Sequence, residues 1–298
     1  MMDALLLAST VKKKPRIGID LMGDVISLPA ELEADCHVQF ITAEEVITMD
    51  DDPVSAVRKK KKSSLNIALN LLKDGEIDAL ISCGNTGALL VGAVSTLPLI
   101  EGISRPALIT LFPTKGTPVA VLDVGANVTC KADHLHQFAK MGIAFQKSRG
   151  IKNPKVGLLN IGTEETKGRE ELKQAYLLLN EDPLISFSGN IEGRDVFNGV
   201  VDVLVTDGFT GNIFLKTAEG LSSFILERLG EKGGNYPELD YAEYPGALLA
   251  GVNGIVIKCH GEFNKKALIS AIKKGAELVS EGFLNTLKSF YTGKSNAI

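Results

Sequence analysis

Residues 118–127 read Pro-Val-Ala-Val-Leu-Asp-Val-Gly-Ala-Asn, a run of consecutive apolar residues that ends in an aspartate, a glycine and an asparagine. Strands that are covered on both faces of a sheet are apolar at consecutive positions rather than at alternate ones. Residues 203–208, Val-Leu-Val-Thr-Asp-Gly, repeat this pattern. Both stretches therefore predict buried strands of a sheet that lies between layers of helices.

The same pattern extends over most of the chain. Apolar runs that end in small or polar residues occupy positions 16–20, 78–85, 107–113, 118–127, 155–163, 184–193, 201–208 and 254–261. Patterns typical of helices lie between them, at 63–73, 132–146, 170–179, 213–229 and 264–279. Alternation of strands and helices predicts an α/β fold with a largely parallel sheet core flanked by helices.

Composition excludes several classes of protein. The 298 residues are enough for one large domain or for two lobes that share a sheet, and 45% hydrophobic with 23% charged residues is ordinary globular composition. A net charge of −4 argues against a nucleic-acid partner. The four cysteines are far apart and form no CxxC pair, so the sequence predicts no disulfide framework, no metal site and a reducing compartment.

Two segments raise the question of a membrane. The apolar run at 4–8 precedes Lys12–Lys14, which is the reverse of the order in a secretory signal, so residues 1–15 are expected to be a ragged extension. Residues 79–100 contain no charged side chain over 22 positions, which is long enough to span a bilayer. They also contain a Gly-Asn-Thr-Gly turn, and a strand, a turn and a buried helix explain them better.

Polar residues gather where the apolar runs end. In an open parallel sheet these strand ends line one crevice, where ligands bind. Each such residue alone could be a turn or helix-cap residue, but seven of them favour a site. They are Asp20, Asn85, Asp123, Asn127, Asn160, Asn190 and Asp207.

Two glycine-rich turns suggest anion binding. Each follows a predicted strand and precedes an apolar helix, so free N–H groups at the helix start would face a bound anion. Neither turn is a Walker loop, and no GxGxxG follows a strand, so phosphate fits better than a nucleotide. The candidate residues in these turns are Gly84, Asn85, Thr86, Gly87, Asp207, Gly208 and Gly211.

A third loop, residues 160–168, contains Thr163, Glu164 and Lys167. A lysine in such a place is usually a solvated surface charge, but this one enters a helix after two carboxylates. It could reach over the crevice to an anion, because a lysine ammonium suits phosphate as a point charge.

Other residues allow two interpretations. Cys83 is a candidate nucleophile that would form a covalent thioester. The favoured interpretation is a small buried residue behind the turn. His260 is either a general base or a hydrogen-bonded core histidine. A basic cluster is either the solvated start of a helix or a docking patch for an acidic partner, and it consists of Arg58, Lys59, Lys60, Lys61 and Lys62.

Together these segments resemble the phosphate acyltransferase (PlsX) family, which makes acyl phosphate for phospholipid synthesis. The resemblance runs from Ile17 to about Gly282. The matching stretches are 20–24, 49–51, 58–64, 84–88, 122–127, 157–168, 189–193, 207–220 and 251–261.

This resemblance implies an acyltransferase that converts acyl-[acyl-carrier-protein] and inorganic phosphate to acyl phosphate and free carrier protein. It implies no cofactor and no metal, a cytoplasmic homodimer, and peripheral contact with the inner face of the membrane. The implied fold is like that of isocitrate and isopropylmalate dehydrogenases and phosphotransacetylase, with a dimerisation lobe. Residues 16–298 would form a single catalytic domain of two lobes that share one core.

Lys167 and Asn212 match the lysine and the asparagine that the family is held to use in catalysis. Phosphate dianion is already a nucleophile, so the enzyme needs chiefly to hold it and remove its water. Lys167 and the glycine-rich amides could do this. Asn212 or backbone N–H groups could donate to the carbonyl oxygen as negative charge builds on it.

The sequence departs from the family in three places. One glycine of the usual Met-Gly-Gly-Asp is missing at residues 22–24, and the chain that follows, up to Val38, is short. The segment 221–241 is also short, where the family has a helical hairpin associated with dimerisation and membrane contact. Glu262 and Phe263 follow His260-Gly261, where the family often has serine.

Two other functions stay open at this point. A short-chain phosphotransacetylase that uses coenzyme A would have a nucleotide pocket in place of an apolar channel beside residues 84–88. A catalytically reduced scaffold or binding protein is suggested by the shortened N-terminal part, whereas the presence of Lys167 and Asn212 argues against it.

Overall fold

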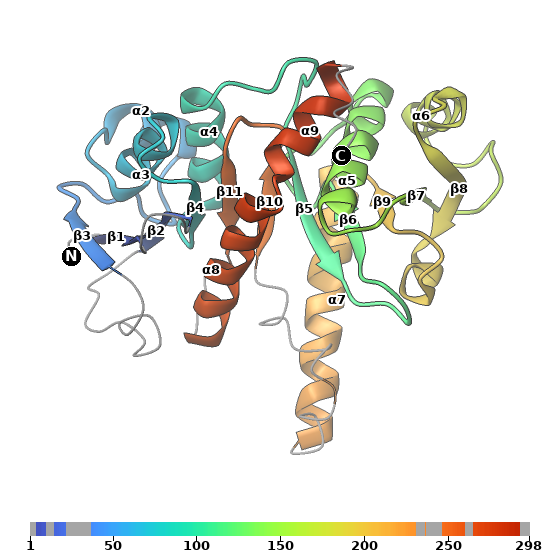
Figure 1. Ribbon diagram of the computed structural model, residues 1–298. Coiled ribbons are helices and arrows are strands. Elements are labelled where there is room, and N and C mark those ends of the chain that lie inside the picture. Colours follow the sequence, from blue (N-terminus) through green and yellow to red (C-terminus); the bar gives the residue numbers. More distant parts are fainter. Residues whose placement is uncertain are drawn as a thin grey trace. The chain divides into compact units, whose positions relative to one another are not determined.

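The computed structural model describes residues 4–9, 15–21, 37–230, 236, 246–259 and 265–292. The chain divides into two compact units (Figure 1). The first comprises Met1–Ile100 and Val252–Leu284, and the second comprises Glu101–Gly251 and Asn285–Ile298. The larger segment of the second unit, Glu101–Gly251, is therefore inserted into the sequence of the first, and its smaller segment follows the first unit at the end of the chain.

The first unit contains a sheet in the strand order β3-β1-β2-β4-β11. Strands β2, β4 and β11 are parallel, with Asp20 and Lys258 both opposite Ser82. Strand β1 is antiparallel to β2 and β3. The strands are β1 (Ala4–Ser9), β2 (Ile17–Leu21), β3 (His37–Thr42), β4 (Ala79–Ser82) and β11 (Ile255–Lys258).

Strand β1 corrects one expectation. Residues 1–15 were expected to be a ragged extension, but Ala4–Ser9 forms a strand that pairs on both sides. The backbone of this apolar run finds partners in β2 and in β3. The extent of the catalytic domain, 16–298, stays a prediction.

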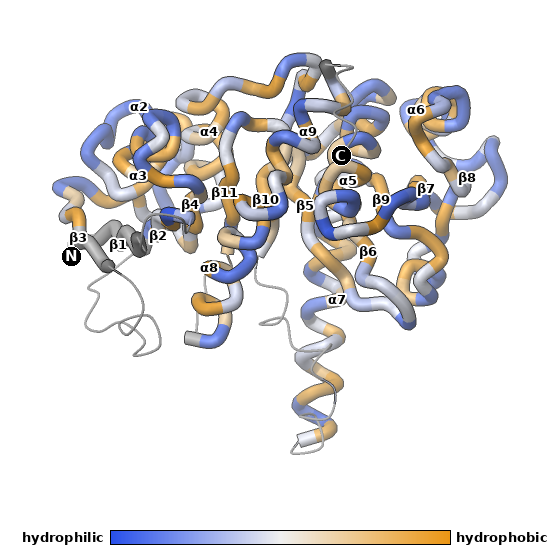
Figure 2. The backbone as a smooth tube through the Cα atoms, viewed as in Figure 1, coloured by the Kyte–Doolittle hydropathy of each residue, from blue (hydrophilic) through white to orange (hydrophobic). Residues whose placement is uncertain are grey.

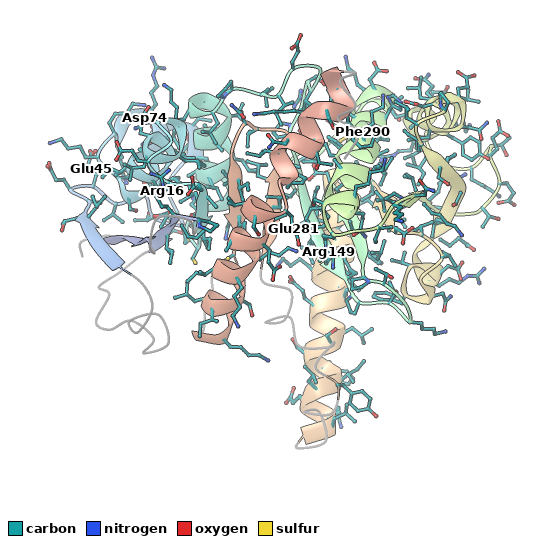
Figure 3. All side chains as sticks on the ribbon, in the orientation of Figure 1. Arg16, Glu45, Asp74, Arg149, Glu281 and Phe290 are labelled. Carbon is teal, nitrogen blue, oxygen red and sulfur yellow. The ribbon has the colours of Figure 1, made fainter. Side chains whose placement is uncertain are left out.

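Helices pack on the parallel part of this sheet. The helices α3 and α8 both contact β2 and β4. Arg16, labelled in Figure 3, ties the start of β2 to the start of β4, because its amide and its guanidinium both donate to Asp78. The helices are α2 (Pro53–Lys59), α3 (Ser64–Lys73), α4 (Thr86–Thr96) and α8 (Lys265–Ser280).

The uncharged stretch 79–100 forms a strand, a turn and a helix, as predicted. Its apolar side chains fill β4 and the inner side of α4, where Leu89 and Ala93 are buried. Among the residues that the structure describes, no helix is both long and apolar enough to cross a membrane.

The second unit contains a sheet in the order β10-β5-β6-β9-β7-β8. Strands β6, β9, β7 and β8 are parallel, and Val205 lies opposite both Leu122 and Leu158. Strand β5 is antiparallel to β6 and β10. The strands are β5 (Ala107–Phe112), β6 (Val119–Leu122), β7 (Lys155–Asn160), β8 (Ser186–Glu192), β9 (Val203–Val205) and β10 (Ala247–Ala250).

Its helices differ in how much surface they bury. Helix α5 packs on β6 and β9, and α6 packs on β7 and β8. In α7 only Gly208 and Gly211 are buried, and Figure 2 shows that its long exposed part carries both hydrophobic and hydrophilic residues. The helices are α5 (Ala132–Ser148), α6 (Glu170–Glu181), the 3₁₀ helix η1 (Gly193–Asn198), α7 (Gly208–Leu229) and α9 (Phe283–Thr292), which begins in the first unit.

The predicted α/β class is confirmed, because each unit contains a run of parallel strands, β2-β4-β11 in the first and β6-β9-β7-β8 in the second, with helices packed on it. All eight apolar runs contain strands. The dimerisation lobe stays a prediction.

Candidate active site

Strand register in the second unit gathers polar residues at one edge of its sheet. Strands β6, β9 and β7 run parallel and in register, and each ends at this edge. Asp123 follows β6 directly, Asp207 follows β9, and Asn160 ends β7. Asn190 lies in the last half of β8, the outer neighbour of β7. The shared edge that the sequence predicted is therefore present within this unit.

Asp123 organises the loop that follows β6. Its carboxylate is fully buried and accepts hydrogen bonds from the amides of Leu108, Gly125, Ala126 and Asn127, at 2.7–3.1 Å. Burial raises the pKa of Asp123, although these hydrogen bonds oppose the shift. The glycine-rich amides here are thus already bound to a carboxylate of the chain itself.

Two glycines allow helix α7 to begin against this loop. A Cβ on Gly211 would lie 1.9 Å from the carbonyl oxygen of Asp123, and a Cβ on Gly208 would lie 2.5 Å from that of Asn127. The Gly208 amide donates to the Asn127 carbonyl at 2.8 Å. Only residues without a side chain permit so close an approach of two backbones.

Asn212 is the fifth residue of α7 and lies over the Asp123 loop. The position of a Cβ on Gly125 would be 3.4 Å from Oδ1 of Asn212. Gly125 has φ +136°, which favours glycine. Asn212 itself is exposed, so its carboxamide is accessible at the strand edge.

The loop that carries Lys167 is held by two asparagines from neighbouring strands. Asn160 Nδ2 donates to the Lys167 carbonyl at 3.1 Å, and Asn190 Nδ2 donates to the Glu164 carbonyl at 2.9 Å. Gly168, with φ +87°, packs against Asn160 so closely that a Cβ would lie 2.5 Å from its Oδ1. Both asparagines are buried and serve the backbone of the loop.

Lys167 projects from this loop toward solvent. Its Nζ lies 3.8 Å from Oε1 of Glu164, and its side chain is 48% exposed. Thr163 and Glu164 are exposed as well. The ammonium is therefore accessible to a bound anion, with only a loose contact to a neighbouring carboxylate.

Sequence reasoning missed one charged residue of this edge, Arg169. Its guanidinium forms an ion pair and a hydrogen bond with Asp207, which caps α7 by accepting from the Thr210 amide at 2.9 Å. Nothing in the sequence signals this pair, because the partners are far apart in the chain and meet only through the adjacency of β7 and β9.

In the first unit, a buried carboxylate lies at the end of β2. Asp20 accepts hydrogen bonds from the hydroxyls of Ser64 at 2.6 Å and Ser82 at 2.7 Å. Burial raises the pKa of Asp20, while these two hydrogen bonds and the charge of Lys258 oppose the shift. The turn at 84–87 follows the neighbouring strand β4 at the same edge.

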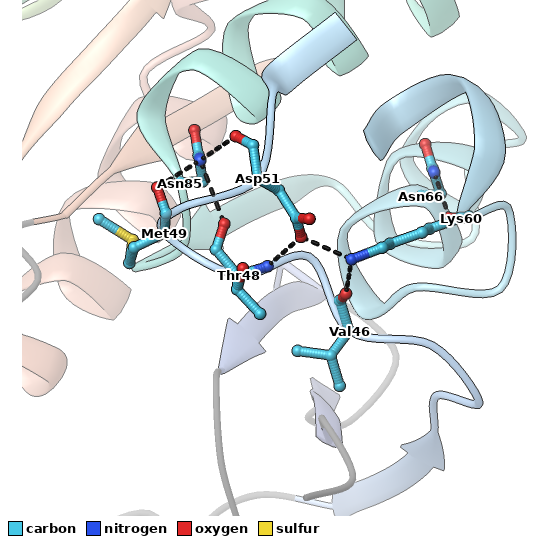
Figure 4. A network of polar contacts seen from close by, with 7 residues as sticks. All are labelled: Val46, Thr48, Met49, Asp51, Lys60, Asn66 and Asn85. Carbon is cyan, nitrogen blue, oxygen red and sulfur yellow. Dashed lines mark hydrogen bonds and ion pairs between the residues drawn. The ribbon is translucent and has the colours of Figure 1, made fainter. Parts of the chain in front are cut away.

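Asn85 has a structural role at this turn (Figure 4). Its Oδ1 caps α4 by accepting from the Ala88 amide at 3.0 Å, and its Nδ2 donates to carbonyls of Thr48 and Met49 at 3.2 and 3.1 Å. The amides of Thr86 and Gly87 have no acceptor within the described part of the chain.

The basic cluster divides into structural and exposed members. Lys60 Nζ donates to the Val46 carbonyl at 2.7 Å and to Asp51 at 2.6 Å, so it fixes the loop before α2 (Figure 4). Lys62 pairs with Glu44, and Lys61 bonds the Val57 carbonyl. Arg58 and Lys59 are exposed in the last turn of α2. Those two residues are the part of the cluster best suited to docking.

The structure favours the passive interpretation of Cys83. Its hydrogen bond with Cys259 and its burial both raise the pKa of the thiol, which disfavours the reactive thiolate. His260 and residues 22–24 lie outside the described residues.

Comparisons with known proteins agree with these motifs. A model of a protein family described as "Fatty acid synthesis protein" matches residues 3–236 and 234–286. A protein of Desulforamulus reducens named "Phosphate acyltransferase" is 42% identical, covering 91% of this chain and 88% of its own. A protein of the same name from Desulfitobacterium hafniense is 45% identical, covering 86% of this chain and 82% of its own. A crystal structure of a phosphotransacetylase from Streptococcus pyogenes matches 78% of this chain and 76% of its own, with a TM-score of 0.54 and 17% identity, and shows a shared fold.

Proposed function

The chain belongs to the fatty acid synthesis protein family, whose relatives described above are named phosphate acyltransferase, and we propose that it transfers a fatty acyl group from the thioester of acyl carrier protein to inorganic phosphate. The products are acyl phosphate, which feeds phospholipid synthesis, and free carrier protein. The observation that carries the mechanism is that an accessible ammonium, on Lys167, and an accessible carboxamide, on Asn212, extend from adjoining strand ends of one sheet.

Lys167 and Asn212 have different roles in this mechanism. The ammonium of Lys167 binds the phosphate dianion and orients one oxygen toward the thioester carbon. That oxygen attacks, the C–O bond forms, and the carbonyl oxygen becomes negative. The Asn212 carboxamide donates to this oxygen. The C–S bond then breaks, and the thiolate of the carrier takes a proton from water.

The buried polar residues of the second unit serve this pair indirectly. Asn160 and Asn190 hold the Lys167 loop, Asp123 orders the loop beneath Asn212, and Asp207 caps the helix. We expect their loss to displace Lys167 or Asn212 rather than to remove a direct contact with substrate. The exposed Thr163 and Glu164 remain candidates for direct contact.

The turn in the first unit is proposed as a further substrate-binding element. The amides of Thr86 and Gly87 at the start of α4 have no internal acceptor within the described residues. Helix N-termini of this kind favour anions. Asp20 is proposed to line the same strand edge, and His260, which lies outside the described residues, stays a candidate from the sequence.

Carrier docking, assembly and location complete the proposal. Arg58 and Lys59 form a basic surface suited to the acidic acyl carrier protein. Exposed apolar residues on α7, among them Ile213, Leu221 and Phe224, support assembly of a cytoplasmic homodimer with peripheral membrane contact.

Acyl phosphate formation tests this function directly. Purified protein is incubated with long-chain acyl carrier protein and phosphate, and the product is trapped with hydroxylamine as hydroxamate. We expect a phosphate-dependent signal that falls by about 10²–10³-fold in Lys167→Ala and in Asn212→Ala. Matched controls are Lys155→Ala, at the opposite end of β7, and Asn180→Ala, exposed on α6.

Parallel reactions separate the alternatives. Faster turnover with acetyl coenzyme A than with acyl carrier protein would favour a phosphotransacetylase. Phosphate binding without any acyl phosphate would favour a scaffold protein. Wild-type rates in both active-site variants would refute the roles assigned to Lys167 and Asn212.

A further inference from the structure

We propose that Arg169 is a positioning residue for the acyl transfer, which acts through Asp207 to hold the Lys167 loop against the first turn of α7. The inference rests on the proposed function. It assigns a role to a residue that contacts neither the phosphate nor the thioester in that mechanism.

Strand order explains why one ion pair can link the two elements. Strands β7 and β9 are parallel neighbours, with Leu158 opposite Val205. The Lys167 loop starts at the end of β7, and α7 starts after the end of β9. Two separate segments therefore leave the sheet side by side, and only contacts beyond the strands fix how far apart they stay.

Asp207 is anchored on the α7 side of the link. Its side chain is 4% exposed, and it accepts from the Thr210 amide at 2.9 Å and from the Thr210 hydroxyl at 3.1 Å. Its backbone carbonyl accepts from the Gly211 amide at 2.9 Å. The carboxylate is thus a rigid part of the turn that presents Asn212.

Arg169 is anchored on the other side. Its carbonyl accepts from the amides of Leu172 and Lys173 at 3.0 and 3.2 Å, so its backbone belongs to the start of α6. It is the N-cap residue of α6, yet its side chain makes no cap hydrogen bond and reaches Asp207 instead. Lys167 lies only two residues before it, with the positive-φ Gly168 between them.

The exposure of Arg169 makes a positioning role distinguishable from a stabilising role. The Arg169 side chain is 59% exposed, and Asp207 keeps two hydrogen bonds from Thr210 when Arg169 is removed, so the ion pair should contribute modestly to stability. Misplacement of a catalytic group by about 1 Å, in contrast, can lower turnover by about 10²-fold. Loss of Arg169 should therefore reduce turnover far more than it reduces stability.

The test compares Arg169→Ala, Asp207→Asn and the double variant. Asp207→Asn keeps an oxygen that can cap α7 but removes the negative charge. Arg149→Ala is the matched control, because this arginine (Figure 3) donates a hydrogen bond to Gln146, which itself bonds the Pro118 and Asp202 carbonyls at the opposite end of β6 and β9. Turnover, the KM for phosphate and the thermal unfolding midpoint are measured for each.

We expect turnover to fall by about 10–100-fold in each single variant, and the double variant to be no worse than the poorer single one, because both remove the same link. Unfolding midpoints should stay near that of wild type, and Arg149→Ala should retain its rate. Added guanidinium ion, well below denaturing concentrations, should partly restore Arg169→Ala, and Arg169→Lys should retain more activity than Arg169→Ala. A purely structural role would move the unfolding midpoint and would not be rescued.

Three results would overturn the inference. One is wild-type turnover in Arg169→Ala, and another is a double variant whose loss equals the product of the two single losses. The third is no acyl phosphate from wild type itself, which would refute the proposed function too. If the wild type is active and Arg169→Ala is equally active, the inference is refuted and the proposed function stands. If Asp207→Asn unfolds, the turnover of Arg169→Ala and its rescue by guanidinium ion still test the inference.

Discussion

Helix α7 contains two glycines for which the same substitution should have opposite effects. At Gly211, a Cβ would lie 1.9 Å from the Asp123 carbonyl oxygen and 2.9 Å from Cγ2 of Thr206. At Gly220, nothing lies within 4 Å of the added carbon. Both positions are in one helix, so Gly211→Ala and Gly220→Ala differ chiefly in the space around the new methyl group.

The magnitudes follow from that geometry. Alanine stabilises a helix interior by about 1 kcal/mol relative to glycine, and at Gly220 nothing opposes this gain. A carbon and an oxygen normally stay about 3.3 Å apart, so Gly211→Ala must move two backbone segments by roughly 1.4 Å. Overpacking of this kind costs about 1–3 kcal/mol or more. Because the gain from alanine applies to both positions, we expect the two variants to differ in free energy of unfolding by the overpacking cost, about 1–3 kcal/mol or more.

Denaturant titration followed by circular dichroism measures this difference. The titrations are run at two protein concentrations, because a dependence on concentration would reveal a change in self-association through the exposed half of α7. Gly211→Ala also shifts Asn212, so acyl phosphate formation should fall by about 10²-fold. Equal stability of the two variants would show that the first turn of α7 can move freely against the Asp123 loop, and the close approach described here would be wrong.

Three further predictions concern other parts of the chain. Burial alone would raise the pKa of Asp182, but hydrogen bonds, chiefly from Lys140, lower it, so its stabilisation is present above the unfolded pKa of about 3.9 and is lost as pH falls through the lower folded pKa. Asp182→Asn should therefore cost stability at pH 7 and progressively less toward pH 3 in denaturation experiments. Lys59→Glu should raise the KM for acyl carrier protein and leave the KM for phosphate unchanged. Cys83→Ala should retain activity, and mass spectrometry should find no acyl adduct on the wild-type thiol, because its hydrogen bond with Cys259 and its burial raise its pKa.

The fold was predictable where a segment carries its own signal. The runs at 118–127 and 201–208 are apolar because their strands are covered on both faces, and that cause acts on each strand separately. Strand β1 was missed because its pairing with β3 depends on a second segment of the chain. Helix α2 was missed although Asp52-Pro53 is a recognisable helix start, and the basic cluster begins in its last turn.

The sequence predicted which residue types belong to the candidate site, but not which groups their side chains contact. Asp123 and Asp207 were placed correctly at strand ends, yet their carboxylates bind amides of the chain itself. A sequence cannot say which acceptor a given amide will meet. Arg169 was missed for the same reason, because its partnership with Asp207 depends on which strands are neighbours.

The interrupted sequence of the first unit has a consequence for biosynthesis. Strand β4 ends at residue 82, whereas its neighbour β11 begins only at residue 255. At about 5–20 residues per second, a ribosome needs roughly 10–35 seconds to translate the intervening chain. During that interval one side of β4 in the nascent chain has no partner strand, while the second unit is already emerging. Translation therefore delivers the inserted segment, Glu101–Gly251, before the first unit can close its sheet.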